Sequence, residues 1–174
     1  GSVFSFSVEL GLDERERAQP APPSALEGRD VLVADDNEAS RSMLAGLLRQ
    51  WKMRVREAGS GAEALVQLDK QPADLVLLDS PMSDMDGFGA AEQILKRADA
   101  PRVALLSSIG TKGDAARCRE IGIGAYLPKP VARDELFGMV RGMLAPQAGG
   151  RADLVTRHSL REERRPLDLL LVED

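Results

Sequence analysis

Polar side chains that could act together on one chemical group follow four short apolar segments of this sequence. They are Asp35 and Asp36 after VLVA, Asp79 after LVLL, Ser107 after VALL, and Lys129 after AYLP. A short apolar run bounded by turn residues is typical of a strand that is buried on both faces. Open α/β sheets hold their ligands at the carboxyl ends of such strands, so we expect these five residues at one edge of a sheet. Asp79 is the candidate reactive residue.

Three neighbouring carboxylates would bind either protons or a cation. Two carboxylates about 4 Å apart repel each other by roughly 4 kcal/mol at an effective dielectric constant of 20. A small number of hard oxygen ligands suits Mg²⁺, which keeps several waters and takes one or two carboxylates together with phosphate oxygens. With a hydroxyl from Ser107 and an ammonium from Lys129, the set would bind a phosphoryl group and offer Asp79 as its acceptor.

Four of these five residues also have a simpler interpretation. Asp35 or Asp36 would cap the helix that follows the first apolar run. Ser107 would cap the end of a strand, and Lys129 would be a solvated surface charge. The combination of all five at strand ends favours the phosphoryl site.

The elements that position these residues alternate between strands and helices. The first expected helix shows the helical period most clearly, with Leu44, Leu48 and Trp51 on one face. Two prolines flank Lys129 and favour extended backbone, and we expect the Lys129–Pro130 peptide bond to be cis. The expected strands are 31–34, 54–58, 75–78, 103–106 and 125–127, and the expected helices begin after Asp36 or Asn37 and at Ser60, and cover 88–96, 114–120 and 134–144.

Five units of strand and helix predict an α/β fold. Short apolar strands joined by helices form a parallel sheet with right-handed crossovers and helices on both faces. For five strands we expect the flavodoxin-like order 2-1-3-4-5, which makes the first and third strands neighbours. Asp35, Asp36 and Asp79 then meet at the same carboxyl-terminal edge.

The bulk composition excludes several other classes of protein. The 174-residue chain is 43% hydrophobic, but it has no apolar run long enough to span a bilayer and no signal peptide. Its net charge of −5 argues against nucleic acid as the main partner. The lone Cys118 excludes an internal disulfide framework and is typical of a reducing cytosol. We therefore expect a cytoplasmic segment without direct membrane contact, although its full-length parent could be anchored in a membrane.

Composition divides the chain into five parts. The central part is the expected compact domain, and it lies between two segments with the proline, glycine and charge content of linkers. The first ten residues alternate like a half-buried strand with no nearby partner. The last eight residues, LDLLLVED, repeat the pattern DVLVADD and predict the start of a second copy of the domain, unless the similarity is due to chance. The five parts are 1–10, 11–28 (linker), 29–145 (domain), 146–166 (linker) and 167–174.

Separated motifs of the central part resemble the receiver domain of bacterial two-component phosphorelays. These motifs are VADDN, LVLLDSPMSDMDG, ALLSS and AYLPKP, and the resemblance extends over about 29–145. The first ten residues are similar to the last strand of a histidine kinase ATP-binding domain, and LDLLLVED is similar to the start of a second receiver. The resemblance thus implies a hybrid sensor histidine kinase with tandem receivers, of which this is the first. His158 lies in HSLRE, which weakly resembles a kinase phosphoacceptor box but lacks the surrounding two-helix pattern.

The resemblance implies a metal-dependent phosphoacceptor at the acidic residues. Asp79 would be the phosphoacceptor. Asp35 and Asp36 would be the acidic pair that holds Mg²⁺, with Asp79 and the main-chain carbonyl of Pro81 as further ligands. Such a receiver takes its phosphoryl group from a histidine kinase core or a histidine phosphotransfer domain. It lacks kinase catalytic motifs and at most catalyses its own phosphorylation and dephosphorylation.

The other matched residues would form the switch. Lys129 would sense the phosphate, Ser107 would supply the switch hydroxyl, and Tyr126 would be the aromatic switch. In the family, phosphorylation remodels the surface of the fourth helix, fifth strand and fifth helix. Two departures bear on this function: Ser83 stands where proline is common, which favours a less rigid loop, and Pro81 offers no polar side chain at a position that tunes dephosphorylation.

Two functions are open from the sequence. In the first, phosphoryl transfer from phosphohistidine to Asp79 switches the domain in signal transduction. In the second, the domain is a regulatory binding module that docks on the kinase or a neighbouring receiver and senses a small ligand such as a cyclic dinucleotide. The complete acceptor set favours the first. Neither interpretation fixes the oligomeric state, and a weak homodimer through the last helices is left open.

Overall fold

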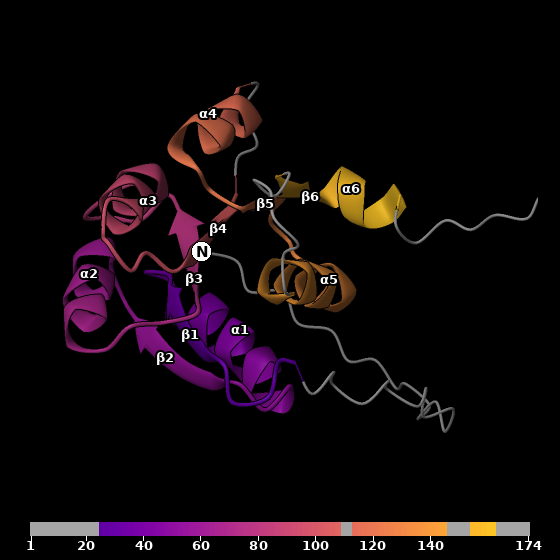
Figure 1. Cartoon of the computed structure of the whole chain (residues 1–174), viewed down its shortest axis with the longest axis horizontal. Helices are drawn as coiled ribbons and strands as arrows, with labels where there is room; N and C mark the ends of the chain where they lie inside the picture. The colour runs from indigo at the N-terminus through magenta and orange to yellow at the C-terminus, as the bar shows by residue number, and fades with distance from the viewer. Residues whose placement is uncertain (1–24, 109–112, 146–153, 163–174) are drawn as a thin grey trace, which may run out of the picture.

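A computed structural model describes residues 25–108, 113–145 and 154–162 of the chain. Within these residues, parallel strands form one sheet in the order β2-β1-β3-β4-β5-β6, and helices cover both of its faces (Figure 1). The strands are β1 (Asp30–Ala34), β2 (Arg54–Ala58), β3 (Leu75–Ser80), β4 (Arg102–Ser107), β5 (Ala125–Pro128) and β6 (Val155–Thr156). The helices are α1 (Glu38–Gln50), α2 (Gly61–Lys70), α3 (Gly87–Leu95), α4 (Asp114–Ile121), α5 (Arg133–Leu144) and α6 (Arg157–Glu162).

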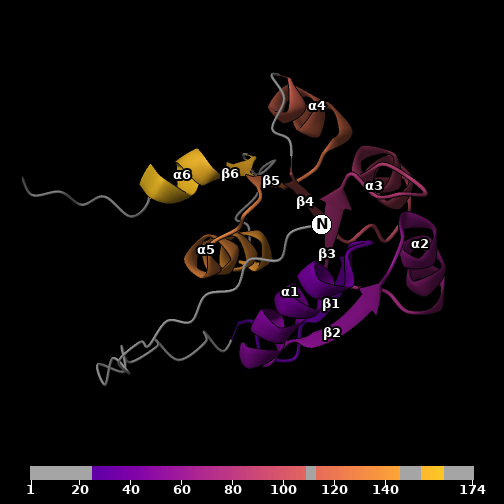
Figure 2. The ribbon, with the colours of Figure 1, turned by 180° about the vertical axis from the view of Figure 1, so that it is seen from behind.

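The two faces of the sheet carry separate apolar cores, because successive side chains of a strand point to opposite faces. On β3, Leu75 and Leu77 pack with residues of α1 and α5. Val76 and Leu78 pack with residues of α2, α3 and α4 on the other face. The same division of helices is visible when the molecule is turned by 180° (Figure 2). Burial on both faces explains why β3 is a continuous apolar run in the sequence.

The polar residues before the helices explain where three helices begin. Asn37 caps α1 by accepting a hydrogen bond from the main-chain N–H of Ser40 at 3.0 Å. Ser60 and Asp86 cap α2 and α3 in the same way. Because Asn37 rather than Asp36 is the cap of α1, the Asp36 side chain is available for other contacts.

The strand order of the first five strands is the predicted 2-1-3-4-5. The sixth strand is an addition to the predicted sheet. β6 pairs with β5, and the adjoining α6 contacts α5, although both fall in the segment 146–166 that its composition suggests is a linker. The strands predicted at 1–10 and 167–174 lie outside the described residues and stay predictions. In the part of the chain that the structure describes, no helix is long and apolar enough to cross a membrane.

Candidate functional site

Three carboxylates meet at the carboxyl-terminal edge of the sheet. β1 and β3 are neighbouring strands, and Ala34 of β1 lies beside Leu78 of β3. The residues that directly follow Ala34 and Leu78 are therefore close together. One carboxylate oxygen from each of Asp35, Asp36 and Asp79 lies within 4.8 Å of the others. Asp35 and Asp79 are only 1% and 6% exposed, whereas Asp36 is exposed to solvent. This donor set consists of the hard oxygen ligands that Mg²⁺ prefers.

The ammonium group of Lys129 lies between the two buried carboxylates. Its Nζ atom is 2.6 Å from Oδ1 of Asp79 and 2.7 Å from Oδ2 of Asp35. Burial lowers the pKa of Lys129, but hydrogen bonds and charge from Asp35 and Asp79 outweigh it and raise this pKa above its ordinary value. The cluster therefore already binds one positive charge, and a divalent cation fits the same donor set. The Lys129–Pro130 peptide bond is cis, as we expected.

Burial is the largest influence on the pKa of Asp79. It raises the pKa of the Asp79 carboxyl group, Lys129 lowers it, and the net pKa lies above the ordinary value for aspartate. The surroundings of Asp79 therefore disfavour its ionised form, because the positive charge of Lys129 does not fully offset the effect of burial. A further cation nearby would favour the ionised form, which is the form that can attack phosphorus.

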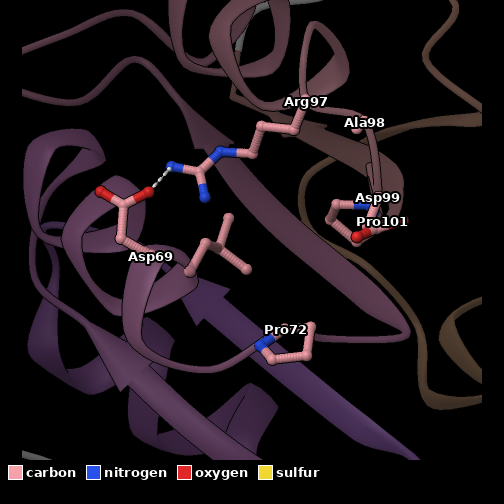
Figure 3. A pocket seen from close by; sticks show the side chains of 7 residues that line it. Asp69, Pro72, Arg97, Ala98, Asp99 and Pro101 are labelled. Atoms are coloured by element: carbon pink, nitrogen blue, oxygen red, sulfur yellow. Dashed lines mark ion pairs between the residues drawn. The ribbon is translucent and has the colours of Figure 1, made fainter.

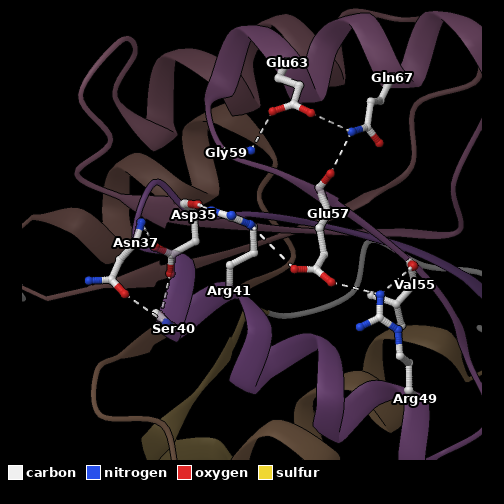
Figure 4. Close-up of polar contacts among 10 residues, drawn as sticks. All are labelled: Asp35, Asn37, Ser40, Arg41, Arg49, Val55, Glu57, Gly59, Glu63 and Gln67. Carbon is white, nitrogen blue, oxygen red and sulfur yellow. Dashed lines mark hydrogen bonds and ion pairs between the residues drawn. The ribbon is translucent and has the colours of Figure 1, made fainter.

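The main chain and side chain of Asp35 are fixed by Asn37, the cap of α1, and by residues at the start of that helix. The main-chain N–H of Asn37 donates to Oδ1 of Asp35 at 2.9 Å, and Oγ of Ser40 donates to Oδ2 at 2.7 Å. Arg41 donates to the main-chain oxygen of Asp35 at 2.7 Å and lies 3.6 Å from a carboxylate oxygen of Glu57 on β2 (Figure 4). Sequence reasoning missed Ser40 and Arg41. The only feature of the sequence that could have indicated them is their position in the first turn of the helix that follows Asp35 and Asp36.

The polar network continues from Glu57 toward α2, as Figure 4 shows. Arg49 forms a 2.9 Å ion pair with Glu57, whose main-chain oxygen accepts a hydrogen bond from Gln67 at 2.7 Å. Gln67 also donates to Glu63, which in turn accepts from the main-chain N–H of Gly59 at 2.7 Å. These contacts tie α1, β2 and α2 together beside the strand that presents Asp35.

The loop after β3 contacts the acidic cluster through its main chain. The N–H of Ser83 donates to Oδ2 of Asp36 at 2.8 Å. A proline at this position would have no N–H and could not make this bond, so Ser83 orients Asp36. Asp84 accepts hydrogen bonds from two main-chain N–H groups at the start of α2, which fixes the far side of the loop. The Ser80–Pro81 peptide bond is also cis, which sequence reasoning did not predict, and Pro81 is exposed.

The expected switch residues Ser107 and Tyr126 lie on β4 and β5. Ser107 ends β4, is 4% exposed, and accepts a 2.7 Å hydrogen bond from the main-chain N–H of Lys129. Tyr126 is 9% exposed, and its hydroxyl donates to Oδ2 of Asp114 at 2.8 Å. Burial raises the pKa of Tyr126, with Asp114 acting in the same direction and Ser107 opposing it. Tyr126 thus connects the strand edge to the first turn of α4.

A shallow pocket of about 330 Å³ lies at the opposite edge of the sheet. Figure 3 shows Arg97 and Asp69 beside it, joined by an ion pair of 2.8 Å. Arg97 also donates to the main-chain oxygen of Leu65 at 3.0 Å. The residues that line the pocket are Leu68, Asp69, Pro72, Arg97, Ala98, Asp99 and Pro101. None belongs to the acidic cluster, so this pocket is separate from the candidate site.

Comparison with known proteins places the chain among signalling proteins. Hybrid signal transduction histidine kinase L of Dictyostelium discoideum is 32% identical over 131 residues, which cover 71% of this chain and 8% of that protein. Transcriptional regulatory protein ZraR of Escherichia coli K12 is 34% identical over 116 residues, covering 67% of this chain and 26% of that protein. Sensor histidine kinase RcsC of Salmonella typhi is 30% identical over 134 residues, which cover 75% of this chain and 14% of that protein. The chain spans about half or less of the length of the curated relatives it matches.

Solved structures share the fold. The chemotaxis response regulator CheY4 of Vibrio cholerae is 22% identical, with a TM-score of 0.63 over 67% of this chain and 98% of that chain. A chain of the CheX-CheY-BeF3-Mg complex from Borrelia burgdorferi is 23% identical, with a TM-score of 0.65 over 69% of this chain and 92% of that chain. The family model described as the response regulator receiver domain matches residues 31–141, within which the three carboxylates, Ser107 and Lys129 all lie. This chain therefore belongs to the response regulator receiver domain family.

Proposed function

We propose that this chain is the phosphoacceptor receiver of a hybrid histidine kinase, in which Asp79 takes a phosphoryl group from a phosphohistidine in a Mg²⁺-dependent transfer. The observation that carries the proposal is the buried Asp79 carboxylate, which shares the Lys129 ammonium with Asp35 and has an oxygen within 4.8 Å of one from Asp36. Receiver domains belong to two-component signalling. Two relatives that are named as histidine kinases support the hybrid context.

The chemistry is the transfer of a phosphoryl group from nitrogen to oxygen. A carboxylate oxygen of Asp79 attacks phosphorus, and the P–N bond to the donor imidazole breaks. The bonding electron pair returns to the imidazole nitrogen, which takes up a proton. Negative charge spreads over the three oxygens of the phosphoryl group during the transfer. Lys129 supplies positive charge to these oxygens, and the Ser107 hydroxyl, at the end of the neighbouring strand, supplies a hydrogen-bond donor.

The residues that would hold Mg²⁺ are Asp35, Asp36 and Asp79, together with the main-chain carbonyl of Pro81. The three clustered carboxylate oxygens suit this ion, and the ion pairs of Lys129 already bring one positive charge to two of the carboxylates. Bound Mg²⁺ would supply neutralising charge for the phosphoryl oxygens. The contacts of Asn37, Ser40 and Ser83 described above would hold Asp35 and Asp36 in place for this role.

The signal would leave the site through Ser107 and Tyr126. A phosphoryl group on Asp79 would attract the Ser107 hydroxyl, and Tyr126 would follow, changing its contact with Asp114 on α4. The surface of α4, β5 and α5 would then differ between the two states. We propose a histidine kinase core or a histidine phosphotransfer domain as donor, a neighbouring receiver as a docking partner, and the cytoplasm as the location.

The test is phosphoryl uptake by the whole chain. The protein is incubated with Mg²⁺ and acetyl phosphate, and its intact mass is measured. We expect the mass of one added phosphoryl group, no gain for Asp79→Asn, and no gain when EDTA removes Mg²⁺. The matched control is Asp99→Asn, because Asp99 is an exposed carboxylate in the loop that leads to the amino end of β4, at the opposite edge of the sheet.

Two results would contradict the proposal. Uptake by Asp79→Asn equal to that of the unchanged chain would show that another residue is the acceptor. No uptake by the unchanged chain, together with no Mg²⁺ binding in a calorimetric titration, would favour the alternative function. The domain would then be a regulatory module that docks on the kinase or a second receiver, and cyclic dinucleotides would be the first ligands to titrate.

A further inference from the structure

The segment 154–162, which contains β6 and α6, covers the edge of the sheet beside β5. The main-chain N–H of Val155 donates to the carbonyl of Gly124 at 2.9 Å, and β6 continues in parallel register with β5. Leu160 is 7% exposed, and one of its methyl carbons lies 3.1 Å from the position that a Cβ atom would occupy on Gly138 of α5. The segment is therefore packed on the domain, with an apolar anchor against α5.

Arg157 makes the most specific contacts of this segment. Its Nη2 atom donates to the main-chain carbonyl of Pro128 at 2.6 Å and to that of Pro130 at 2.7 Å. Its Nε atom lies 2.8 Å from Oε1 of Glu135, while the other carboxylate oxygen of Glu135 accepts from the main-chain N–H of Ala132. One guanidinium group thus joins the loop after β5 to the first turn of α5.

The two carbonyls that Arg157 contacts belong to the residues on either side of Lys129. The main-chain N–H of Lys129 is bonded to the Ser107 carbonyl at 2.7 Å, and its Nζ reaches Asp35 and Asp79. The main chain of Lys129 is therefore held by β4 on one side and by Arg157 on the other. The side chain that balances the acidic cluster extends from this fixed point.

We propose that Arg157 is a positioning residue for Lys129, and that it couples docking of the segment 154–162 to the state of the acidic site. This inference rests on the proposed function of Asp79. A new charge at Asp79 changes the force on the Lys129 ammonium, and the main chain that bears it is bonded to Arg157. Coupling between two sites is reciprocal, so a docked segment would in turn favour the Lys129 position that accepts a phosphoryl group.

The guanidinium group is suited to this role in a way that an amine is not. Arginine presents several N–H donors in a planar fork of fixed geometry, which lets it contact two carbonyls and a carboxylate at once. Lysine would keep the positive charge but would offer one nitrogen at the end of a flexible chain. Arg157→Lys therefore separates the effect of charge from the effect of geometry.

The experiment uses the full chain and three variants: Arg157→Ala, Arg157→Lys and the matched control Arg141→Ala. Arg141 is an exposed arginine in the last turn of α5. The initial rate of phosphoryl uptake is measured at saturating Mg²⁺ and acetyl phosphate. We expect Arg157→Ala to react about tenfold more slowly, within the usual range of coupling between sites. Arg157→Lys is expected to recover only part of this loss, and Arg141→Ala to react like the unchanged chain.

A second measurement does not depend on phosphorylation. The Cε–H NMR signals of the Lys129 side chain, next to its ammonium group, are compared between Arg157→Ala and Arg141→Ala without Mg²⁺ or phosphodonor, and we expect shifts only in the first. Uptake by Arg157→Ala at the rate of Arg141→Ala would overturn the positioning role while leaving Asp79 as acceptor. If the unchanged chain takes up no phosphoryl group, the proposed function fails. The NMR comparison then decides: shifted Lys129 signals support the positioning role, and unshifted signals overturn it. Arg157→Lys replaces Arg157→Ala in both measurements if the alanine variant does not fold.

Discussion

Substitution of Gly87 by alanine is expected to destabilise the domain directly at the candidate site. Gly87 is the first residue of α3 and is buried against the end of β3. A Cβ atom at this position would collide with the main-chain oxygen of Asp79 and would lie 2.6 Å from a methyl carbon of Leu105. The Asp79 oxygen is part of a paired strand and cannot rotate away, so α3 would have to move outward from the sheet.

The size of the effect follows from the crowding. Inserting one methyl group into a packed core typically costs about 1–3 kcal/mol. At roughly 4 °C per kcal/mol for a domain of this size, Tm would fall by about 4–12 °C. The matched control is Gly46→Ala in the middle of α1, where a Cβ atom would meet no atom within 4 Å. Alanine there should stabilise the helix by about 0.5–1 kcal/mol and raise Tm slightly, because alanine loses less backbone entropy than glycine.

The assay is thermal unfolding followed by circular dichroism, with phosphoryl uptake measured on the same samples. Opposite shifts of Tm in Gly87→Ala and Gly46→Ala, with slower uptake only in Gly87→Ala, are the expected result. A Tm for Gly87→Ala equal to or above that of the unchanged chain would refute the reasoning. It would mean that α3 can move away from the sheet without loss of stability, and that the close approach of Gly87 to Asp79 does not position Asp79.

Three further predictions concern protonation and hydrogen bonding. Because the pKa of Asp79 is raised on folding, its contribution to stability is present at low pH and is lost as the pH rises through that pKa. Asp79→Asn should therefore increase the free energy of unfolding in metal-free buffer at pH 7, and the gain should shrink when urea unfolding is repeated at pH 5. Burial raises the pKa of Cys118 from its ordinary value of 9.0 to about 11, so its thiolate population is about 100-fold lower. Iodoacetamide should label it slowly at pH 8 until urea unfolds the chain, and fast labelling of the folded protein would contradict this. Tyr126→Phe removes the hydrogen bond to Asp114 and should cost about 1 kcal/mol in urea unfolding, whereas an unchanged midpoint would show that the bond adds nothing.

Local patterns were sufficient to predict the first five strands, and the strand order typical of five-stranded α/β folds then predicted that the carboxylates would meet. Runs such as LVLL identify doubly buried strands, and the carboxyl ends of parallel strands must share an edge. The two residues of β6 are too few to show a period, and they become a strand only because β5 presents an unpaired edge to them. The contacts of Arg41 with Asp35 and of Arg157 with two carbonyls depend on main-chain oxygens that no residue type reveals. The bond from Ser83 to Asp36 was hidden for the same reason, since it uses the main-chain N–H.

The charge balance of the acidic cluster gives a physical reason for the metal dependence that we propose. When all are ionised, the three carboxylates and the ammonium of Lys129, which contacts the two buried ones, carry a formal charge of −2. Phosphorylation would replace the single charge of Asp79 by a phosphate of about −1.5 to −2, so the metal-free product would be more negative than the reactant. Two of the carboxylates are buried, where such repulsion is screened least. Lys129 by itself cannot offset this increase, and a divalent cation held by the exposed Asp36 and the two buried carboxylates would. The same balance explains why Lys129 must be positioned accurately: it is the cation in this cluster that the fold itself supplies, and Arg157 fixes the main chain from which it extends.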